Sequence, residues 1–428
     1  MKLAEVFAMV VPEERGVGFR AYDGSEAGPT DATVILDVRD RRAIEYFAGS
    51  RTQLGLARAY VSGDLEIIGD PYEAMMRLYP PPHPQLTLAE KARLVRQFLP
   101  AALRRPTPPP QEQRLSGARH SKGRDAEAIH HHYDVSNDFY RMVLGPTMAY
   151  TCAVFPDSES TLEDAQTEKF DLVCRKLGLR PGMTLLDIGC GWGGIVLHAV
   201  RNYGVHAIGV TLSAHQAKWG QQAIEDAGLG DRAQIRFSDY RDVPETGFDA
   251  VSSIGLTEHI GRDNYPAYFA FAFEKLKPEG RMLNHTITRP NDVEPSHYKA
   301  SFINRYVFPD GELSGPGHIM STMNHAGFEI RHEENLREHY SLTLKHWCQN
   351  LEDNWDAAVA EAGLGTARVW RLYMAASRMG FDLNTIQLHQ TLGVKLAPRG
   401  VSGMPLRPDF GTPALGKQVA DSGHRIDE

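Results

Sequence analysis

A glycine-rich turn at residues 185–194, LLDIGCGWGG, has the residue types and spacing of a nucleotide-binding loop. An apolar run leads into Asp187, and Gly189 and Gly191 allow backbone angles and a close ligand approach that a larger side chain would prevent. Gly189, Gly191 and Gly194 also fit the spacing of a dinucleotide fingerprint. The loop alone therefore leaves two cofactors open, a nicotinamide dinucleotide and S-adenosylmethionine (SAM).

The residues at the end of the next predicted strand indicate which of these two cofactors is bound. A dinucleotide enzyme would carry an acid there, roughly 20 residues after the glycines, to bind the adenosine ribose. This chain reads IGVTLS at 208–213, without an acid. Asp187 instead stands two residues before Gly189, in the D-x-G-x-G pattern of the first motif of SAM methyltransferases. The sequence therefore favours SAM, with Thr211 and Gln216 bonding the ribose hydroxyls in place of the acid.

Polar side chains follow three later predicted strands. Asp239 and Tyr240 come after the third strand, where the carboxylate can accept from the adenine amine and the ring can stack on the base. Glu258 and His285 come at the ends of the next two strands. Because ligands of doubly wound sheets gather outside the carboxyl ends of the strands, we expect Glu258 and His285 to face one cavity at the sulfonium end of SAM.

The elements that must position these residues alternate between strands and helices. Strands separated by helices indicate a parallel sheet covered on both faces. We therefore expect an α/β fold, a doubly wound, mostly parallel sheet of seven strands as in class I SAM-dependent methyltransferases. The expected strands are 184–188, 206–210, 233–237, 248–253, 280–287, 327–331 and 385–392, and the expected helices follow Thr161, begin at Gly194, and cover 214–226 and 265–276.

Four parts of the chain are expected around this sheet. They are a small α+β unit at 1–100, a basic Pro-rich linker at 101–128, a methyltransferase domain with a lid and a helical insertion at 129–396, and a disordered tail at 397–428. In the insertion Leu344, Trp347, Leu351 and Trp355 recur at spacings of three and four. This stripe is typical of a packed core and would also suit a tunnel for a long apolar substrate.

Composition excludes several classes of protein. The formal charge of −8 argues against general nucleic-acid binding, and the four cysteines show no disulfide or metal spacing. Consecutive histidines at 130–132 point in different directions on a helix, which disfavours a metal site. No secretion signal and no run of ~20 uncharged residues is found. We expect a cytoplasmic protein.

Charge is unevenly distributed along the chain. Residues 91–124 carry nine Lys or Arg against one acid, Glu112. Such a segment suits an anionic surface, and a phospholipid bilayer is one. Any membrane contact should be peripheral.

Several motifs together make the sequence resemble the cyclopropane fatty-acid synthases and the related mycolic-acid methyltransferases. The resemblance covers about 131–394, with a weaker echo in the first 100 residues. The motifs are HYDVSNDFY (132–140), YTCAVF (150–155), LLDIGCGWGG (185–194), GVTLSAHQ (209–216), DYRDV (239–243), EHIG (258–261), HTI (285–287) and YSLTLKHW (340–347).

This resemblance implies transfer of a SAM methyl group to the cis double bond of a phospholipid acyl chain, on the inner face of the cell membrane. Bound bicarbonate would remove a proton from the resulting carbocation. The residues that the resemblance assigns to bicarbonate are Cys152, Glu258, His285, Ile287 (through its backbone) and Tyr340. The SAM contacts that it implies are Tyr150, Thr151, Gly189, Gly191, Thr211, Leu212 and Gln216.

The product is less well determined by the motifs. Thr257 and Asn284 stand beside the two anchors where these synthases have apolar residues, and a polar group near the cation could change which proton leaves. The chain also looks like the actinobacterial enzymes that begin 10-methyl branched fatty-acid synthesis, notably in the TITRP run after His285. We therefore expect a 10-methylene product, which a flavin- or nicotinamide-dependent reductase would convert to a methyl branch. A cyclopropane product, a small-molecule methyltransferase and a non-catalytic lipid-binding protein stay as alternatives, and the number of subunits is left open.

Overall fold

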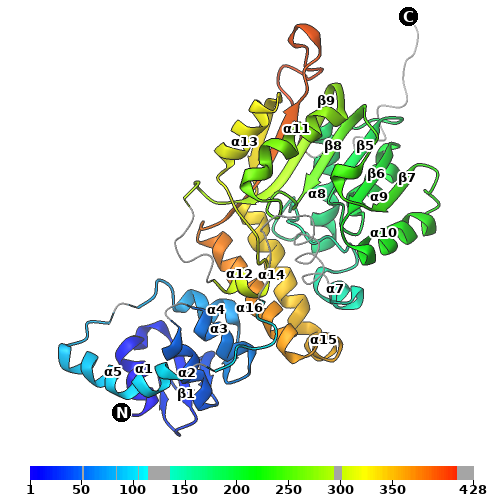
Figure 1. The fold of residues 1–428 in the computed structure, drawn as a ribbon. Coiled ribbons are helices and arrows are strands. Elements are labelled where there is room, and N and C mark those ends of the chain that lie inside the picture. Colours follow the sequence, from blue (N-terminus) through cyan, green and yellow to red (C-terminus); the bar gives the residue numbers. More distant parts are fainter. Residues whose placement is uncertain (51–52, 83, 105, 114–134, 294–300, 412–428) are drawn as a thin grey trace, which may run out of the picture.

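The computed structural model describes the chain except residues 51–52, 83, 105, 114–134, 294–300 and 412–428. Figure 1 shows an N-terminal unit at one end, a large sheet flanked by helices at the other, and a group of helices between them. The triple histidine at 130–132 and the second half of the expected linker lie outside the described residues.

The large sheet has the order β10-β11-β9-β8-β5-β6-β7. Neighbouring strands from β9 to β7 are parallel, whereas β11 runs antiparallel to both β9 and β10. This is the mostly parallel, seven-stranded sheet that the sequence predicted. Its strands are β5 (Thr184–Ile188), β6 (His206–Thr211), β7 (Ala233–Phe237), β8 (Phe248–Ile254), β9 (Leu276–Thr288), β10 (Glu329–Asn335) and β11 (Gln387–Val394).

Strand alternation divides the apolar side chains of the sheet between two cores. Leu185 packs into one core with the helices on one face of the sheet, and the next residue, Leu186, packs into the core on the other face. Both faces are therefore buried, as expected for strands that read as continuous apolar runs. The first face is covered by α8 (Leu162–Leu177), α9 (Gly194–Tyr203) and α10 (Ala214–Asp226), and the second by α11 (Tyr265–Lys275) and α13 (Pro316–His325).

The helices beside the sheet form a third core. Leu344, Trp347 and Leu351 of the predicted stripe are buried in it, and Leu344 also lines a cavity. The stripe is thus mainly a packed core that contributes one wall residue. These helices are α7 (Asn137–Leu144), α12 (Phe302–Tyr306), α14 (Arg337–Asp353), α15 (Trp355–Ala362) and α16 (Leu364–Asp382).

The N-terminal unit has its own small sheet, in the order β2-β1-β3-β4, and its own core. It extends past residue 100, because its last helix continues to Leu103. Its elements are α1 (Leu3–Val10), β1 (Val17–Ala21), β2 (Glu26–Ala27), β3 (Val34–Val38), α2 (Arg41–Gly49), α3 (Leu54–Val61), β4 (Leu65–Ile68), α4 (Pro71–Arg77) and α5 (Leu88–Leu103).

The expected linker and the expected disordered tail both make specific contacts with the rest of the protein. In the expected linker, the Glu112 carboxylate accepts hydrogen bonds from Nε and Nη2 of Arg58, each at 2.6 Å. In the expected tail, a 3-10 helix covers Pro398–Gly400, and the Phe410 carbonyl accepts from Arg175 at 3.2 Å. The prediction of disorder was wrong for residues 397–411, because a Pro- and Gly-rich composition does not reveal such anchoring contacts. Residues 412–428 lie outside the described part of the chain.

No helix in the described ranges combines the length and apolar character needed to cross a bilayer. The same ranges contain no cluster of three or more His, Cys, Asp or Glu side chains arranged to hold a metal ion.

Arg368 of α16 joins the N-terminal unit to the rest of the protein. Its guanidinium donates to the Tyr60 carbonyl at 2.9 Å and forms an ion pair with Glu66, and its side chain is 7% exposed. We expect Arg368→Met to lower the free energy of unfolding by about 2 kcal/mol, because the Tyr60 carbonyl loses its buried donor and Glu66 keeps only its pair with the exposed Arg39. Chemical denaturation measures this.

The matched control is Arg20→Met, which removes an exposed pair with Glu26. This substitution should lower the free energy of unfolding by less than about 1 kcal/mol. Equal losses in both variants would contradict a role of Arg368 in joining the two parts.

Candidate active site

The glycine-rich loop lies at the carboxyl end of β5 and borders a cavity of about 200 Å³. Gly189 and Gly191 have φ angles of 77° and 54°, which side chains rarely adopt. A Cβ on Gly191 would meet no protein atom within 4 Å, so this backbone is open to a ligand. The predicted cofactor residues that line this cavity are Gly189, Gly191, Thr211, Leu212, Gln216, Asp239 and Tyr240.

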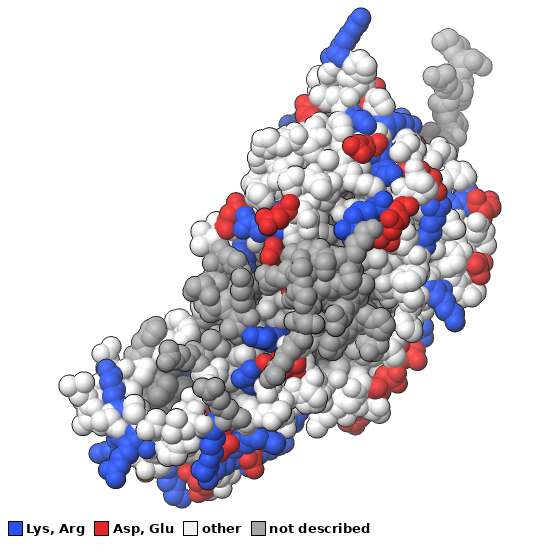
Figure 2. Space-filling view, in the orientation of Figure 1, with Lys and Arg blue, Asp and Glu red and all other residues white. Residues whose placement is uncertain are grey.

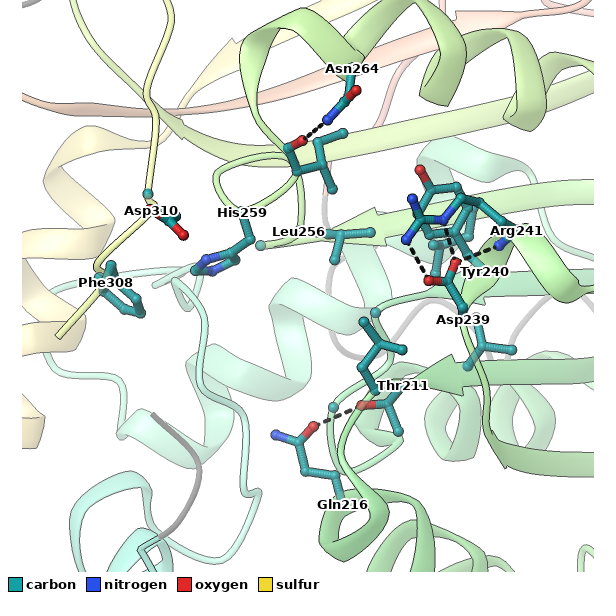
Figure 3. Close-up of a pocket in the computed structure, with 18 of the residues that line it drawn as sticks. Thr211, Gln216, Asp239, Tyr240, Arg241, Leu256, His259, Asn264, Phe308 and Asp310 are labelled. Carbon is teal, nitrogen blue, oxygen red and sulfur yellow. Dashed lines mark hydrogen bonds and ion pairs between the residues drawn. The ribbon is translucent and has the colours of Figure 1, made fainter. Parts of the chain in front are cut away.

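Two polar pairs stand on the wall of this cofactor cavity (Figure 3). The Thr211 hydroxyl donates to Gln216 Oε1 at 2.9 Å, which leaves the Gln216 amide nitrogen as the donor that the pair can offer to a ribose. Asp239 accepts from Arg241 Nε at 2.8 Å and from Nη2 at 2.6 Å. An adenine amine would therefore share the carboxylate with Arg241, a residue that the sequence analysis did not single out.

A smaller cavity of about 90 Å³ adjoins the cofactor cavity, because the two share Gly189, Gly191, Gln216 and Gly255. It is also lined by Tyr150, Thr151 and Asp187. Asp187 accepts from Ser252 Oγ at 2.6 Å, and burial raises the pKa of this carboxyl. The structure thus places Asp187 on the wall of this small adjoining cavity, and not among the residues that line the larger cofactor cavity.

Lys169 of α8 is a further charged residue of this small cavity. Its ammonium donates to Thr151 Oγ1 at 2.9 Å, and burial lowers its pKa. It therefore ties Thr151 to α8. The sequence analysis missed Lys169, although a lysine beside the apolar stripe of α8 was a signal, because lysines are almost never fully buried without a partner.

A third cavity, of about 290 Å³, is lined mostly by apolar and aromatic side chains. Gly255, His259, Phe308 and Gly311 border both this cavity and the cofactor cavity, so the two adjoin. In Figure 3 His259 and Phe308 stand opposite Asp239 and Arg241. We call this third cavity the apolar cavity. Its side chains include Tyr150, Ile303, Tyr340, Leu344, Tyr373, Phe381, Ile386 and Leu388.

Glu258 and His285 line the apolar cavity, as their positions at the ends of β8 and β9 predicted. These strands are neighbours, with Ile254 paired to His285. Glu258 Oε1 accepts from the Ile287 amide at 2.7 Å, whereas Oε2 is buried without a hydrogen-bond partner among the described residues. Burial raises the pKa of Glu258 to about 7 and lowers that of His285 well below its usual value.

A buried chain of polar groups holds the His285 ring. Gln390 Nε2 lies 3.1 Å from His285 Nδ1, and Gln390 Oε1 accepts from Lys176 Nζ at 2.7 Å. Lys176 also forms an ion pair with Glu334 at 2.5 Å. Because the lysine can only donate, it orients the amide so that Nδ1 accepts, which puts the proton of the neutral ring on Nε2. His285 Nε2 is buried, with no hydrogen-bond partner in the described part of the chain.

The other three residues assigned to bicarbonate differ in their placement. Tyr340 lines the apolar cavity and stacks on Phe381, with ring centroids 4.4 Å apart. The backbone amide of Ile287 is bonded to Glu258, so it orients the carboxylate. Cys152 is not among the residues that line the cavity, and its thiol lies 3.1 Å from the Ala153 carbonyl oxygen. Burial raises the pKa of this thiol, which fits neither a nucleophile nor a charged ligand.

The expectation for Thr257 and Asn284 was wrong. Their side chains contact each other at 3.4 Å in the interior, and neither residue lines the apolar cavity. Asn284 precedes His285 on β9, so strand alternation turns its side chain toward the opposite face. They are thus not polar groups beside the reacting carbon.

The site fits a small anion with a hydroxyl group. Glu258 Oε2, an acceptor once the carboxyl is ionised, and a donor, His285 Nε2–H, border the same cavity and have no partners within the described structure. Buried polar atoms of this kind usually bind a ligand or water. Bicarbonate offers one O–H donor and acceptor oxygens, so its chemistry matches this pair.

The buried Glu258 should make stability depend on pH. The unfolded chain ionises this acid near pH 4.5, whereas the folded protein keeps the proton until about pH 7. Stability is therefore lost as the pH rises toward 7, and Glu258→Gln avoids this loss. As the pH rises from 5.5 to 8, we expect the free energy of unfolding of the variant to increase by about 2 kcal/mol relative to that of the native protein.

Urea denaturation at several pH values measures this gain. Glu225→Gln, at an exposed position of α10, is the control and should show no such trend. A pH-independent difference for Glu258→Gln would contradict a buried acid whose pKa is raised to about 7.

Gln390 should control the protonation of the His285 ring. In Gln390→Glu the new carboxylate accepts the proton of Nδ1, so Nε2 becomes an acceptor. We expect kcat for the methyl transfer that the sequence motifs imply to fall at least about 10-fold, while the Kd for SAM changes less than about two-fold. Nitrogen chemical shifts of His285 should report the change of tautomer. Gln387→Glu, on the same strand and bonded to Asn384, is the control. Native kcat in Gln390→Glu would refute the role of Nε2 as a donor.

Comparison with known proteins agrees with this geometry. The family model described as mycolic acid cyclopropane synthetase matches residues 120–391. A probable fatty acid methyltransferase of Mycobacterium tuberculosis is 56% identical over 407 residues, or 91% of this chain and 93% of the relative. A probable fatty acid methyltransferase of Pseudomonas putida is 39% identical over 391 residues, or 90% and 93%.

Solved structures give the same result. The cyclopropane synthase MmaA2 from Mycobacterium tuberculosis is 33% identical, with a TM-score of 0.60, over 63% of this chain and 98% of that one. The mycolic acid cyclopropane synthase CmaA1, solved in complex with SAH and CTAB, matches with the same TM-score of 0.60, 33% identity and coverage of 63% and 98%. The chain therefore belongs to the mycolic acid cyclopropane synthetase family, within the class I SAM-dependent methyltransferases.

Proposed function

We propose that this protein transfers the methyl group of SAM to the cis double bond of an unsaturated, oleoyl-type acyl chain in a membrane phospholipid. One observation carries the proposal. A mostly apolar cavity that adjoins the cofactor cavity is bordered by a polar corner, formed by Glu258 and His285, whose Oε2 and Nε2 atoms are buried without partners among the described residues. The names of the two fatty acid methyltransferases at 56% and 39% identity support a fatty-acyl substrate.

The apolar cavity suits an alkene substrate for a physical reason. An alkene is a weak nucleophile, so the double bond and the methyl donor must be held in line, with water excluded. Aliphatic side chains such as Leu344 and Ile386 bind the acyl chain without competing polar groups. Tyr340, Tyr373 and Phe381 line the same space and offer ring faces that stabilise a positive charge on the substrate.

The polar corner suits the second half of the reaction, in which the carbocation loses a proton. When bound, SAM supplies an electrophilic methyl group and bicarbonate supplies a base. Glu258 Oε2 would accept the hydroxyl proton of the bicarbonate, and His285 Nε2–H would donate to its oxygens. Ile287 keeps Glu258 in place through the 2.7 Å bond from its amide. The tyrosine of this corner, Tyr340, would be a further donor.

The proposed product is the 10-methylene acyl chain, a precursor of a 10-methyl branch. After methyl transfer, hydride moves from the methylated carbon to its neighbour, and the new methyl group loses a proton to form the exocyclic double bond. The support is that the relatives at 56% and 39% identity are named methyltransferases, whereas the cyclopropane synthases are 33% identical. A reductase that uses flavin or nicotinamide would complete the branch. Ring closure to a cyclopropane is the alternative outcome.

This function requires peripheral contact with the inner face of the cell membrane, because the substrate double bond lies within the bilayer. The described helices offer no transmembrane anchor. Surface contact is therefore the proposed way of reaching the substrate.

The test supplies radiolabelled SAM and vesicles of dioleoyl phospholipid to the purified protein. We expect label in the lipid fraction, no label with saturated distearoyl phospholipid, and a loss of at least about 100-fold in Glu258→Gln with the Kd for SAM unchanged. Glu225→Gln is the control. Mass spectrometry with fragmentation separates the methylene product from its cyclopropane isomer. Label that never enters lipid would contradict the proposed function and favour a small-molecule substrate, and full activity of Glu258→Gln would refute its role.

A further inference from the structure

Helix α5 exposes a stripe of large apolar side chains. Leu88, Val95, Leu99 and Leu103 are 85%, 62%, 51% and 75% exposed. They are seven, four and four residues apart, so at ~100° per residue they lie within about 80° of one another around the helix. The exposed Ala92 falls within the same arc. We call these five residues the α5 stripe.

The opposite face of α5 is already packed. Phe98 contacts the core of the N-terminal unit, and Ala101 is buried. Gln97 Nε2 donates to the Met1 carbonyl at 2.9 Å, which brings the partly exposed Met1 beside the helix. The opposite face thus holds the helix on its own domain, and the side chains of the α5 stripe take no part in that packing.

Positive charge borders the α5 stripe. At ~100° per residue Lys91 and Arg96 fall on its two sides, and both are exposed. The one acid of the helix, Glu90, accepts from the Thr87 amide at 2.7 Å in a capping box. Figure 2 shows blue Lys and Arg side chains beside white surface at the end of the molecule where α5 lies in Figure 1.

We propose that the α5 stripe docks the protein on an anionic phospholipid surface, with its aliphatic side chains at the acyl boundary and Lys91 and Arg96 against the headgroups. An apolar face bordered by cations is the pattern of helices that lie in the plane of a bilayer interface. Anionic headgroups complement these cations, and the acyl boundary accepts the exposed aliphatic groups.

Two other occupants fit less well. In a second copy docked antiparallel, the two Arg96 side chains would meet near the twofold axis, because the stripe is centred beside this residue. One helix face is also small against the ~800 Å² per partner of a stable interface. Residues 114–134 contain four Lys or Arg and three consecutive His, so their composition does not match an aliphatic stripe.

This inference rests on the proposed function in one respect, since an acyl chain in a bilayer is the reason to dock there. In Figure 1 α5 lies at the outer end of the N-terminal unit, away from the large sheet. Docking by α5 therefore concerns how the protein reaches the bilayer and leaves the chemistry of the site unchanged.

The test is co-sedimentation of the full chain with vesicles of phosphatidylglycerol and phosphatidylcholine in equal parts, and of phosphatidylcholine alone. We expect tighter binding to the anionic vesicles. The double variant Val95→Gln/Leu99→Gln should bind them at least about 10-fold more weakly. Lys91→Gln/Arg96→Gln should lose the preference for anionic lipid and its dependence on salt. The control is Leu364→Gln/Leu406→Gln, which removes two exposed leucines elsewhere and should bind like the native protein.

Methyl transfer to substrate dispersed in detergent separates the two proposals. All three double variants should keep native activity there, which also shows that they fold. Native vesicle binding by Val95→Gln/Leu99→Gln would overturn docking by α5, even if methyl transfer occurs. Failed methyl transfer with the expected vesicle binding would overturn the proposed function and leave the docking in place. If the native protein is a dimer and Val95→Gln/Leu99→Gln is a monomer that still binds vesicles, the stripe contacts a second copy of the chain and the proposal is refuted.

Discussion

The hydrogen bond from the Ile287 amide to Glu258 Oε1 is the interaction on which the candidate site depends. It joins the segment after β8 to the end of β9 and holds a carboxylate at the wall of an apolar cavity. Removing a carboxyl group from water is costly, which is why its pKa is raised to about 7. In the proposed reaction this group lies where a carbocation forms and where water must be kept out.

His285 is placed by a comparable constraint from the other side. The Lys176 ammonium orients the Gln390 amide, and the amide orients the imidazole. Each bond satisfies a buried polar group, so the ring carries its proton toward the cavity without a charge of its own. The two sides leave one acceptor and one donor in the same corner, which is the arrangement that an anion with a single hydroxyl requires.

Much of the sheet could be predicted because each strand is a short apolar run between turns, and because Gly189 and Gly191 mark the cofactor turn. The expectation that Glu258 and His285 border one cavity required that the strands before them be adjacent, and β8 and β9 are neighbours in the sheet. Gln390 and Lys176 could not be predicted in this way, since β11 pairs with β9 more than 100 residues away in the chain. The direction of the Cys152 thiol and the packing of Glu112 on Arg58 depend on tertiary contacts that no local pattern encodes.

In the proposed reaction a carbon–carbon double bond receives the methyl group, and the resulting cation then loses a proton from that transferred methyl group. The most direct measurement supplies SAM with a trideuterated methyl group to the enzyme and dioleoyl phospholipid vesicles, and counts the deuterium in the product acyl chain by mass spectrometry. The account predicts two deuterium atoms, for a methylene or a cyclopropane product alike. Three retained atoms, or label confined to the headgroup or absent from lipid, would contradict it.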